Sequence, residues 1–418
     1  MNELRPRSDS RSRSAGAPAG IARHGRLKKQ HGISTILRLF ALSLAVILLS
    51  GGSIAAIAYN KIMHPATKVL PALQAAPPEV GAIQGGFNIL IVGSDTRQGQ
   101  GGIGGNAAVE TSVLNDVNIL LHVSQDQTNA VAISFPRDMV VGIPQCPWKN
   151  GHGTKGYSTE PLNVALYYGG LNCAVMTIHE LTGLPIQYAG MITFKGVINM
   201  SDAVGGVDVC VNGPMRDTYT GLNLPKAGTY NLHGLQALQF LRSRHGVGDG
   251  SDLTRISSQQ VYLSSLVRTL KSKETLSDPK KLYDLAQAAF SNDNMTLSSS
   301  LGNMNTMVSI ALALKNIPIE RVTFVQYPGR TGGTGLYSGK VQPNRALGDQ
   351  MMALVRADKP FRLEAAGDGR GSEKNAQAPK PTETADPSAE PIDNSHLPVL
   401  SGVHGQTAAD YTCSIANN

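Results

Sequence analysis

An uncharged apolar stretch at residues 39–59 (LFALSLAVILLSGGSIAAIAY) constrains this 418-residue chain more than any other feature. At about 1.5 Å per residue, such a stretch spans the hydrocarbon core of a bilayer, which is roughly 30 Å thick. The alternative is a cleavable signal peptide, because Ala56 and Ala58 form an A-x-A-like site. The apolar core of a signal peptide is usually only about 7–15 residues long. We therefore expect one transmembrane helix over residues 39–60.

The charges around this stretch predict its orientation. Residues 1–38 carry nine Lys or Arg and two acidic residues, and the positive-inside rule places such an end in the cytoplasm. The rest of the chain has equal numbers of basic and acidic residues, so the net charge of +7 does not indicate nucleic-acid binding. We expect a single-pass protein of the cell membrane with a disordered cytoplasmic tail at 1–38, a Pro/Ala-rich linker at 61–84, an extracytoplasmic main domain and no nucleic-acid partner.

The four cysteines all follow the apolar stretch, on the expected outer side, where disulfides persist. None forms a C-x-x-C pair, so their spacing does not favour a zinc site. We expect Cys146 to pair with Cys173 and to close a loop of about 27 residues. Cys210 either pairs with Cys413 or is a small buried residue in the strand-like segment VDVCV, and the sequence leaves both possibilities open.

The main domain is expected over residues 85–360, where strand-like and helical segments alternate. Strand-like runs cover residues 87–92, 117–123, 130–135, 207–211 and 322–326, and helical periodicity covers residues 161–168, 174–182, 194–203, 235–243, 253–270, 280–290 and 298–314. The first three runs are almost continuously apolar, as is typical of strands buried on both faces. This pattern predicts a three-layer α/β/α domain with a central mixed sheet. Residues 365–391 contain no large apolar side chain, which predicts a disordered C-terminal tail at 361–418.

Charged residues gather at the ends of the first three runs. The first run leads into Asp95 and Arg97, the second starts directly after Asp116, and the third leads into Arg137. Ligands of α/β domains bind at such strand ends. A second charged group stands between two expected helices and consists of Arg242, Arg244, His245, Asp252 and Arg255.

Two carboxylates and several arginines suit a phosphorylated ligand with a divalent cation. Carboxylate oxygens hold Mg²⁺ together with substrate phosphates, and the planar guanidinium group of arginine binds phosphate oxygens in pairs. Ion pairs on the surface and at helix ends are the simpler interpretation of each residue taken alone. Other chemistries have less support, because the chain has no G-x-S-x-G or G-x-x-x-x-G-K-[ST] segment. The single Trp148 and an aromatic content of 5% do not favour a groove that stacks sugars.

Six motifs follow one another over about residues 87–270. They are FNILIVGSDTR at 87–97, SFPRD at 134–138, NVA at 163–165 with Gly169 and Gly170, AVGGV at 203–207, ALQFLRSRH at 237–245, and DLTR at 252–255 with Gln259. In this order they resemble the motifs of the LytR-CpsA-Psr family, most closely those of its actinobacterial members.

This resemblance implies a Mg²⁺-dependent phosphotransferase of cell-wall assembly. Such an enzyme moves a glycopolymer from a polyprenyl-pyrophosphate carrier in the membrane to peptidoglycan and forms a phosphodiester bond. By motif, Asp95 and Asp116 are implied to hold the metal and, with Arg137, to be catalytic, and either carboxylate can take the proton of the acceptor hydroxyl. The residues implied to bind the pyrophosphate are Arg97, Arg137, Arg242, Arg244 and Arg255.

Two motifs depart from the pattern of the family. The family usually has Arg-x-Asp-Thr around the second acid, where this chain has Leu114 and Val117, and it usually has Arg where this chain has Ser258. The loss of two expected anion-binding groups leaves two alternatives open. One is a catalytically impaired, membrane-bound regulator that binds lipid or glycan, and the other is a polyprenyl-pyrophosphate hydrolase that uses water as the nucleophile.

Overall fold

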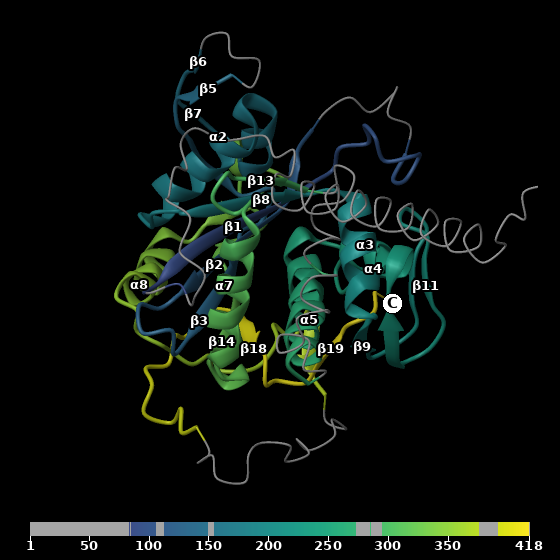
Figure 1. Ribbon diagram of the computed structural model, residues 1–418. Helices are drawn as coiled ribbons and strands as arrows, with labels where there is room; N and C mark the ends of the chain where they lie inside the picture. The colour runs from purple at the N-terminus through teal and green to yellow at the C-terminus, as the bar shows by residue number, and fades with distance from the viewer. Residues whose placement is uncertain are drawn as a thin grey trace, which may run out of the picture. The chain divides into compact units, whose positions relative to one another are not determined.

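The first three expected strands lie side by side in the middle of the main domain, shown in Figure 1 as a computed structural model. The structure describes residues 83, 85–105, 113–148, 154–272, 285, 295–375 and 392–417. All of them belong to one unit, Tyr59–Asn418. The expected tail at 1–38, the transmembrane helix at 39–60 and, apart from Ile83, the linker at 61–84 lie outside these residues. Within the described part of the chain, no helix is both long and apolar enough to cross a bilayer.

The central sheet is mixed and, among the described residues, has seven strands in the order β13-β8-β1-β2-β3-β14-β18. Their bounds are β1 (Phe87–Ser94), β2 (Asn115–Val123), β3 (Ala130–Ser134), β8 (Tyr188–Ile192), β13 (Met295–Leu297), β14 (Val322–Gln326) and β18 (Gly405–Thr407). Strand β2 is antiparallel to both β1 and β3, while β8 is parallel to β1 and β14 is parallel to β3. The C-terminal ends of β1, β3, β8 and β14 therefore lie at one edge of the sheet, together with the start of β2.

Helices cover both faces of this sheet, which confirms the expected mixed α/β fold (Figure 1). Successive residues of a strand point to opposite faces, so Leu90 joins one buried cluster and Ile89 the other. The first cluster includes residues of α2 (Ala165–Thr182) and α8 (Arg345–Arg356). The second includes residues of α7 (Met304–Asn316), and partly buried side chains of α5 (Asp252–Ser272) pack against it. Burial on both faces explains why β1 is almost continuously apolar.

The expected strand at 207–211 does not join the central sheet. It is β9 (Val207–Val211), and it lies in a separate sheet of order β12-β9-β19-β17. Only alternate residues of β9 are fully buried, and Asp208 is exposed. A strand at the centre of a sheet covered on both faces needs two apolar faces, whereas β9 offers one. Helix α5 contacts both β9 and β14, and it thereby connects the two sheets.

The C-terminal region 361–418 is not the disordered tail that its composition predicts. Of its described residues, β17 (Ser372–Lys374) and β19 (Thr412–Ser414) extend the second sheet, and β18 pairs with β14. These strands are largely polar, and buried side chains of β18 and β19 bond to each other and to α5: Gln406 Nε2 donates to Ser264 Oγ (2.7 Å), and Thr412 Oγ1 donates to Gln406 Oε1 (2.7 Å). Long-range hydrogen bonds that composition does not reveal stabilise this region. Residues 376–391 lie outside the described residues.

Both disulfides are present. Cys146 is bonded to Cys173 with a Cα–Cα distance of 5.4 Å, which confirms the expected pair. Cys210 is bonded to Cys413 with a Cα–Cα distance of 4.4 Å, and the two residues are directly opposite in the β9–β19 ladder. The second disulfide therefore attaches the C-terminal strand to the main domain.

Most of the expected helices are present, with two changes. The segments expected at 161–168 and 174–182 are η1 (Leu162–Val164) followed by the single helix α2, which is kinked at Gly169 and Gly170. The helix expected at 298–314 begins only at Met304, and the one expected at 280–290 lies outside the described residues except for Leu285. The remaining elements are β4 (Val140–Ile143), β5 (Cys146–Pro147), β6 (Thr154–Lys155), β7 (Ser158–Pro161), α3 (Phe194–Val204), β10 (Met215–Asp217), β11 (Leu222–Leu224), β12 (Gly228–Leu232), α4 (Gly234–Arg242), η3 (Ile319–Arg321), β15 (Gly329–Arg330), η4 (Gly335–Tyr337) and β16 (Gln342–Pro343).

Candidate active site

The ends of β1, β2 and β3 bring three predicted site residues to one edge of the central sheet. Asp95 follows β1, Asp116 lies at the start of β2, and Arg137 follows β3. The β1–β2 and β2–β3 registers align these strand ends. All three residues line one cavity of about 690 Å³, as do the other four predicted site residues: Arg97, Arg242, Arg244 and Arg255.

The backbone of residue 114 holds Asp95 in place. The Asp95 Oδ1 atom accepts a hydrogen bond from the Leu114 amide (2.7 Å), and the Asp95 amide donates to the Leu114 carbonyl (3.2 Å). Arg97 in turn donates to the Asp95 carbonyl oxygen. Burial raises the pKa of Asp95, and the nearby Asp116 carboxylate raises it further, against the lowering effect of the Leu114 hydrogen bond. A cation between these two carboxylates would relieve their mutual repulsion.

Arg137 lies among three carboxylates. Its guanidinium group is 2.6 Å from Asp116 Oδ1, 3.6 Å from Asp138 Oδ2 and 3.9 Å from Asp252 Oδ1. Burial alone would lower the pKa of Arg137, but these acids, Asp116 above all, raise it. Arg137 is therefore a fixed positive charge directly beside the second acid.

Asp252 joins the two charged groups that the sequence showed separately. This residue is 4% exposed, accepts from the Arg137 amide (3.1 Å) and pairs with Arg255 (2.6 Å) one turn along α5. Arg255 also donates to the Asp116 carbonyl oxygen (2.7 Å). In the sequence, Asp252 stands in the second charged group without an evident role, whereas in the structure it links Arg137 to Arg255.

Asp217, which the sequence analysis did not single out, positions the segment that carries the basic residues after α4. Its Oδ2 atom accepts hydrogen bonds from Ser243 Oγ (2.8 Å), the Arg244 amide (3.0 Å) and the His245 amide (3.1 Å). Burial would raise the pKa of Asp217, but these hydrogen bonds outweigh it and hold the pKa below its usual value. Its only signal in the sequence is an acid after a short strand, which is too common to be informative.

The arginines crowd one another at this end of the cavity. Burial lowers the pKa of Arg244, and the neighbouring guanidinium groups of Arg137 and Arg255 lower it further. Such mutual repulsion is reduced when an anion binds among the groups. The charged end of the cavity therefore has the electrostatic character of a phosphate site.

Phe194 is a second residue that the sequence analysis missed. Its ring lies beneath two guanidinium groups, 5.1 Å from that of Arg97 and 4.3 Å from that of Arg242, in the geometry of a cation–π contact. Gly104 belongs to a glycine-rich loop at residues 99–105 (GQGGIGG). A Cβ atom on Gly104 would lie 2.5 Å from the same ring, so this loop can approach α3 only without a side chain there. Lys195 fixes this loop by donating to the Gly99 carbonyl (2.8 Å).

The other part of the cavity wall is apolar. It comes from β1, β2, β8, α3, α4 and α5, and its side chains include Ile91, Ile119, Ile192, Val197, Met200, Leu238, Leu241, Leu263, Leu266 and Leu270. Ile91 and Ile119 pack against the buried cluster that includes α7. The cavity thus has a charged rim, formed by Asp95, Asp116 and the five arginines that line it, and an apolar wall on the α5 side of the sheet.

Of the residues that depart from the family pattern, Val117 lines the cavity next to Asp116, whereas Leu114 and Ser258 are not among its lining residues. Leu114 acts through its backbone on Asp95, and its side chain is not among the described residues that line the cavity. Ser258 is buried and accepts a hydrogen bond from the Ser414 hydroxyl of β19 at an Oγ–Oγ distance of 2.8 Å. The neighbouring Gln259 does line the cavity and donates to the Leu241 carbonyl (2.8 Å). Position 258 therefore faces the C-terminal strand.

Asp95 and Asp116 fit a magnesium ion as a pair of carboxylates within one cavity. The described residues contain no group of three or more His, Cys, Asp or Glu side chains arranged around a metal site. Mg²⁺ often takes only one or two protein carboxylates and completes its shell with water and substrate phosphates. The donor chemistry of the two acids is compatible with that mode.

Fold and site together define a mixed α/β protein with an arginine-rich rim and an apolar wall in one cavity. The LytR_cpsA_psr family model matches residues 54–352, so the chain belongs to this family. Over 287 residues it is 30% identical to the cell wall biosynthesis protein LcpA of Corynebacterium glutamicum, which covers 62% of this chain and 53% of LcpA. The chain thus spans about half the length of this relative.

Two further proteins are similar to this chain, one in sequence and one in structure. Over 317 residues the chain is 25% identical to the polyisoprenyl-teichoic acid–peptidoglycan teichoic acid transferase TagT of Bacillus subtilis, which covers 73% of this chain and 90% of TagT. The solved structure of protein gbs0355 from Streptococcus agalactiae is similar with a TM-score of 0.50 at 21% identity, over 66% of this chain and 88% of that one. The structural likeness supports the shared fold.

Proposed function

We propose that the protein transfers a glycopolymer from a polyprenyl-pyrophosphate carrier to peptidoglycan during cell-wall assembly. The observation that carries this proposal is the division of one cavity into an arginine-rich rim and an apolar wall. A polyprenyl pyrophosphate has the same two parts, a doubly charged head and a long hydrocarbon chain. The printed names of LcpA and TagT, a cell wall biosynthesis protein and a teichoic acid transferase, support the same function.

The reaction would exchange one phosphorus–oxygen bond for another. A sugar hydroxyl of peptidoglycan attacks the phosphorus that carries the glycan, and the bond from this phosphorus to the bridging oxygen breaks. The polyprenyl monophosphate leaves, and the glycan remains joined to the acceptor through a phosphodiester. The hydroxyl proton goes to Asp95 or Asp116, both of which line the cavity. Arginines fixed at the rim stabilise the negative charge that grows on the bridging oxygen.

Mg²⁺ is the cofactor that we propose for this site. Asp95 and Asp116 would hold it, and when bound it would neutralise charge on the phosphate oxygens. Arg137 is positioned to orient Asp116, because the two groups form a 2.6 Å ion pair. Asp252 contributes indirectly by fixing both Arg137 and Arg255.

We also propose a location at the outer face of the cell membrane. The apolar stretch at 39–59 and the basic residues before it are the basis for a single transmembrane helix with a cytoplasmic N-terminus. Both disulfides lie in the part that would be extracytoplasmic, where an oxidising environment maintains them. Such an anchor would keep the cavity next to a carrier lipid in the same membrane.

The decisive experiment follows product formation by the full-length chain in detergent. The protein is incubated with a synthetic polyprenyl-pyrophosphate glycan and peptidoglycan oligomers, with and without Mg²⁺, and the products are identified by mass spectrometry. We expect a phosphodiester-linked adduct that requires Mg²⁺ and falls at least 100-fold in Asp95→Asn. The matched control is Asp349→Asn, because Asp349 is an exposed acid on α8.

The other outcomes identify the alternatives. Release of the glycan phosphate without an adduct, in the presence of a competent acceptor, would identify a hydrolase. Binding of the carrier lipid with neither product would identify a regulator. Equal activity of Asp95→Asn and Asp349→Asn would show that the cavity is not the reaction site.

A further inference from the structure

Aromatic side chains gather where the β5–β6 hairpin meets the first turn of α2, a helix to which the Cys146–Cys173 disulfide joins the hairpin. The chain has one tryptophan and only 5% aromatic residues, yet Trp148 and Tyr167 both contact Tyr168. The ring centroids of Trp148 and Tyr168 are 5.6 Å apart, and those of Tyr167 and Tyr168 are also 5.6 Å apart. We call these three residues the aromatic cluster. The sequence spacing gave no reason to expect it, because Trp148 follows β5 and the tyrosines lie in the first turn of α2.

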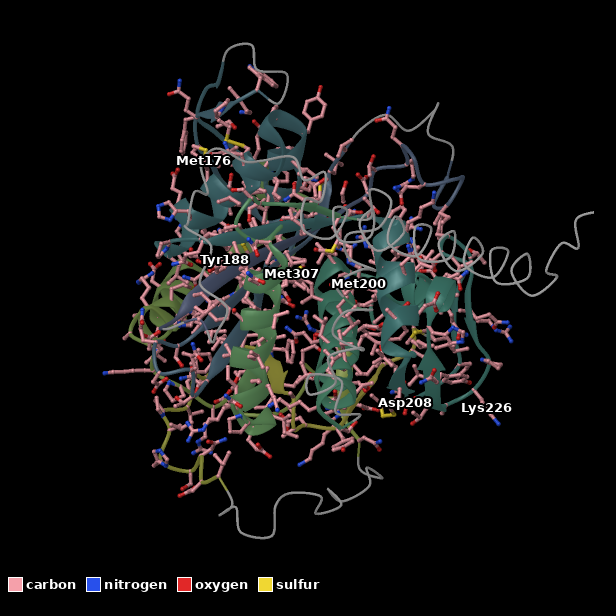
Figure 2. All side chains as sticks on the ribbon, in the orientation of Figure 1. Met176, Tyr188, Met200, Asp208, Lys226 and Met307 are labelled. Atoms are coloured by element: carbon pink, nitrogen blue, oxygen red, sulfur yellow. A yellow bond between two sulfur atoms is a disulfide. The ribbon has the colours of Figure 1, made fainter. Side chains whose placement is uncertain are left out.

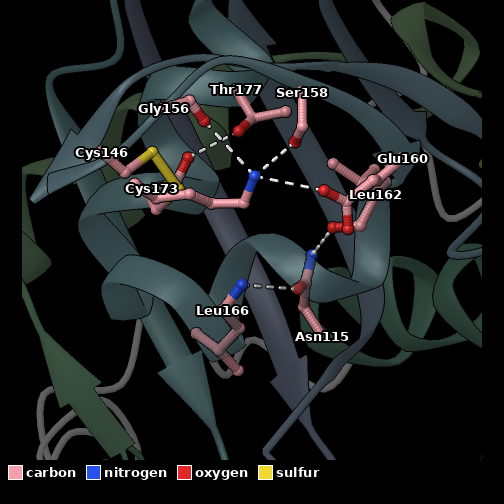
Figure 3. Close-up of a disulfide and its surroundings, with 10 residues drawn as sticks. Asn115, Cys146, Gly156, Ser158, Glu160, Leu162, Leu166, Cys173 and Thr177 are labelled. Carbon is pink, nitrogen blue, oxygen red and sulfur yellow. Dashed lines mark hydrogen bonds and ion pairs between the residues drawn. A yellow bond between two sulfur atoms is a disulfide. The ribbon is translucent and has the colours of Figure 1, made fainter. Parts of the chain in front are cut away.

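Polar contacts and the nearby disulfide hold the cluster in one arrangement. Tyr168 donates its hydroxyl to Glu160 Oε2 (2.7 Å), and the Lys155 ammonium lies 4.2 Å from the Tyr168 ring centroid and 3.1 Å from Glu160. Burial and the hydrogen bond to Glu160 raise the pKa of Tyr168 to about 12. Figure 3 shows the Cys146–Cys173 disulfide beside Ser158 and Glu160.

The kink in α2 allows the hairpin to come this close. At Gly169, an added Cβ atom would lie 2.7 Å from the Pro147 carbonyl oxygen and 2.7 Å from Cys173 Cβ. Only glycine fits at this contact between α2 and β5. Pro147 directly precedes Trp148. Gly169 and the disulfide thus position Trp148 against Tyr168.

Part of the cluster is nonetheless left open to solvent. Tyr167 on α2 is 51% exposed, and Tyr157, between β6 and β7, is 64% exposed. Exposed aromatic rings on a rigid frame are typical of binding surfaces. Lys155 and Glu160 pair with each other, so this surface does not concentrate charge of one sign. Its chemistry suits a ligand with neutral, partly apolar faces.

Two hydrogen bonds connect the cluster to the strands that carry the site residues. The Asn163 amide donates to the Arg137 carbonyl (3.0 Å), and the Leu166 amide donates to Asn115 Oδ1 (3.0 Å). Figure 3 shows Leu166 beside Asn115, the residue that directly precedes Asp116. The aromatic cluster therefore lies at the same edge of the sheet as the charged rim.

The cluster and the apolar cavity belong to opposite faces of the sheet. Helix α2 packs against the buried cluster that includes α8, whereas Ile91 and Ile119 of the cavity wall pack on the face that α7 covers. In phosphoryl transfer, the attacking and leaving oxygens lie roughly in line on opposite sides of the phosphorus. If the leaving polyprenyl phosphate occupies the cavity, the attacking hydroxyl arrives from the α2 side.

We propose that Trp148, Tyr167 and Tyr168 form a stacking surface for the sugar rings of the acceptor glycan strand. A pyranose ring presents an apolar C–H face to an aromatic ring and keeps its hydroxyl groups at the edge. This inference rests on the proposed transferase function, since that function requires a glycan to reach the rim from this side. The surface would align the strand so that one hydroxyl reaches the phosphorus.

The chain carries its own reporter for this test, because Trp148 is its single tryptophan. The full-length protein in detergent is titrated with a peptidoglycan tetrasaccharide that lacks stem peptides, and Trp148 emission is recorded. We expect a saturable change, about tenfold weaker binding in Tyr167→Ala, and restored binding in Tyr167→Phe. The matched control is Leu336→Ala, because Leu336 is a 56% exposed apolar residue outside the hairpin.

A kinetic readout separates positioning of the acceptor from catalysis. Tyr167→Ala should raise the KM for the acceptor about tenfold and leave kcat within twofold of wild type. Asp95→Asn should leave the tetrasaccharide titration unchanged, so a failure of the transferase proposal would not be mistaken for a failure of this one.

Three results would overturn the stacking surface. The first is a wild-type protein whose Trp148 emission does not respond to the tetrasaccharide. The second is equal affinity in Tyr167→Ala and Leu336→Ala. The third is a blue shift of Trp148 emission when the protein is reconstituted into lipid nanodiscs, together with loss of the response to the tetrasaccharide. This result would assign the aromatic cluster to the membrane surface.

Discussion

Removal of each disulfide tests how the chain beyond the central sheet is stabilised. A crosslink restricts the unfolded chain, and this effect grows with the length of the closed loop. The sequence separation of 27 between Cys146 and Cys173 corresponds to about 3.5 kcal/mol in the chain-entropy model. The separation of 203 between Cys210 and Cys413 corresponds to about 5.3 kcal/mol. Replacing the second pair by alanine should therefore lower the free energy of unfolding by about 1.8 kcal/mol more than replacing the first.

The assay is urea unfolding of the two double variants, followed by far-ultraviolet circular dichroism. Trp148 fluorescence is unsuitable here, because that residue lies two positions from Cys146. In the presence of a reductant strong enough to open both disulfides, the wild type and both variants should have the same free energy of unfolding. A larger loss for the Cys146–Cys173 pair than for the Cys210–Cys413 pair would refute the reasoning from loop length. It would show instead that local packing around the hairpin dominates.

Three further changes test the site itself. Asp217→Asn should lower the free energy of unfolding by about 2 kcal/mol at pH 7. A carboxyl whose pKa is lowered by folding stabilises the protein above its unfolded pKa of about 3.9, so urea unfolding at falling pH should show the difference disappear as the pH passes through the lower folded pKa. Arg137→Lys keeps the charge but loses the planar contact with Asp116, and single-turnover transfer should fall about 10- to 100-fold with an unchanged Tm. Phe194→Leu removes the ring beneath Arg97 and Arg242, and titration should show carrier lipid binding about five- to tenfold more weakly.

The site residues could be predicted because they stand at strand ends. Asp95, Asp116 and Arg137 adjoin continuous apolar runs that are recognisable without any structure, and sheet geometry brings the ends of neighbouring strands together. Only six residues (124–129) separate β2 from β3, whereas twenty (95–114) separate β1 from β2, so the sequence alone left the pairing of β1 with β2 open. Asp217 and Phe194 could not be found this way, because they act on arginines through backbone amides and an aromatic ring. Such contacts have no fixed sequence spacing.

The aromatic cluster and the C-terminal strands were missed for a related reason. Composition averages over the chain, so one tryptophan and few tyrosines predict no stacking surface, although the kink at Gly169 brings three of them together. The C-terminal segment has little apolar content, yet Gln406 and Cys413 attach it to α5 and β9. Figure 2 shows how densely side chains fill the space between the sheets and the helices around them. Long-range partners supply the stabilisation that local composition does not reveal.

The role of the C-terminal strand also changes how the departures from the family pattern are understood. From sequence, Ser258 indicates a missing anion-binding group and so leaves a regulator without turnover open as an alternative. In the structure, position 258 faces β19 through Ser414, while Arg255 and Gln259 on the same helix line the cavity. The charge at the rim comes from other positions, and Arg244 is already crowded by Arg137 and Arg255. Ser258 therefore holds the C-terminal strand against α5, and its presence does not argue against the proposed transferase.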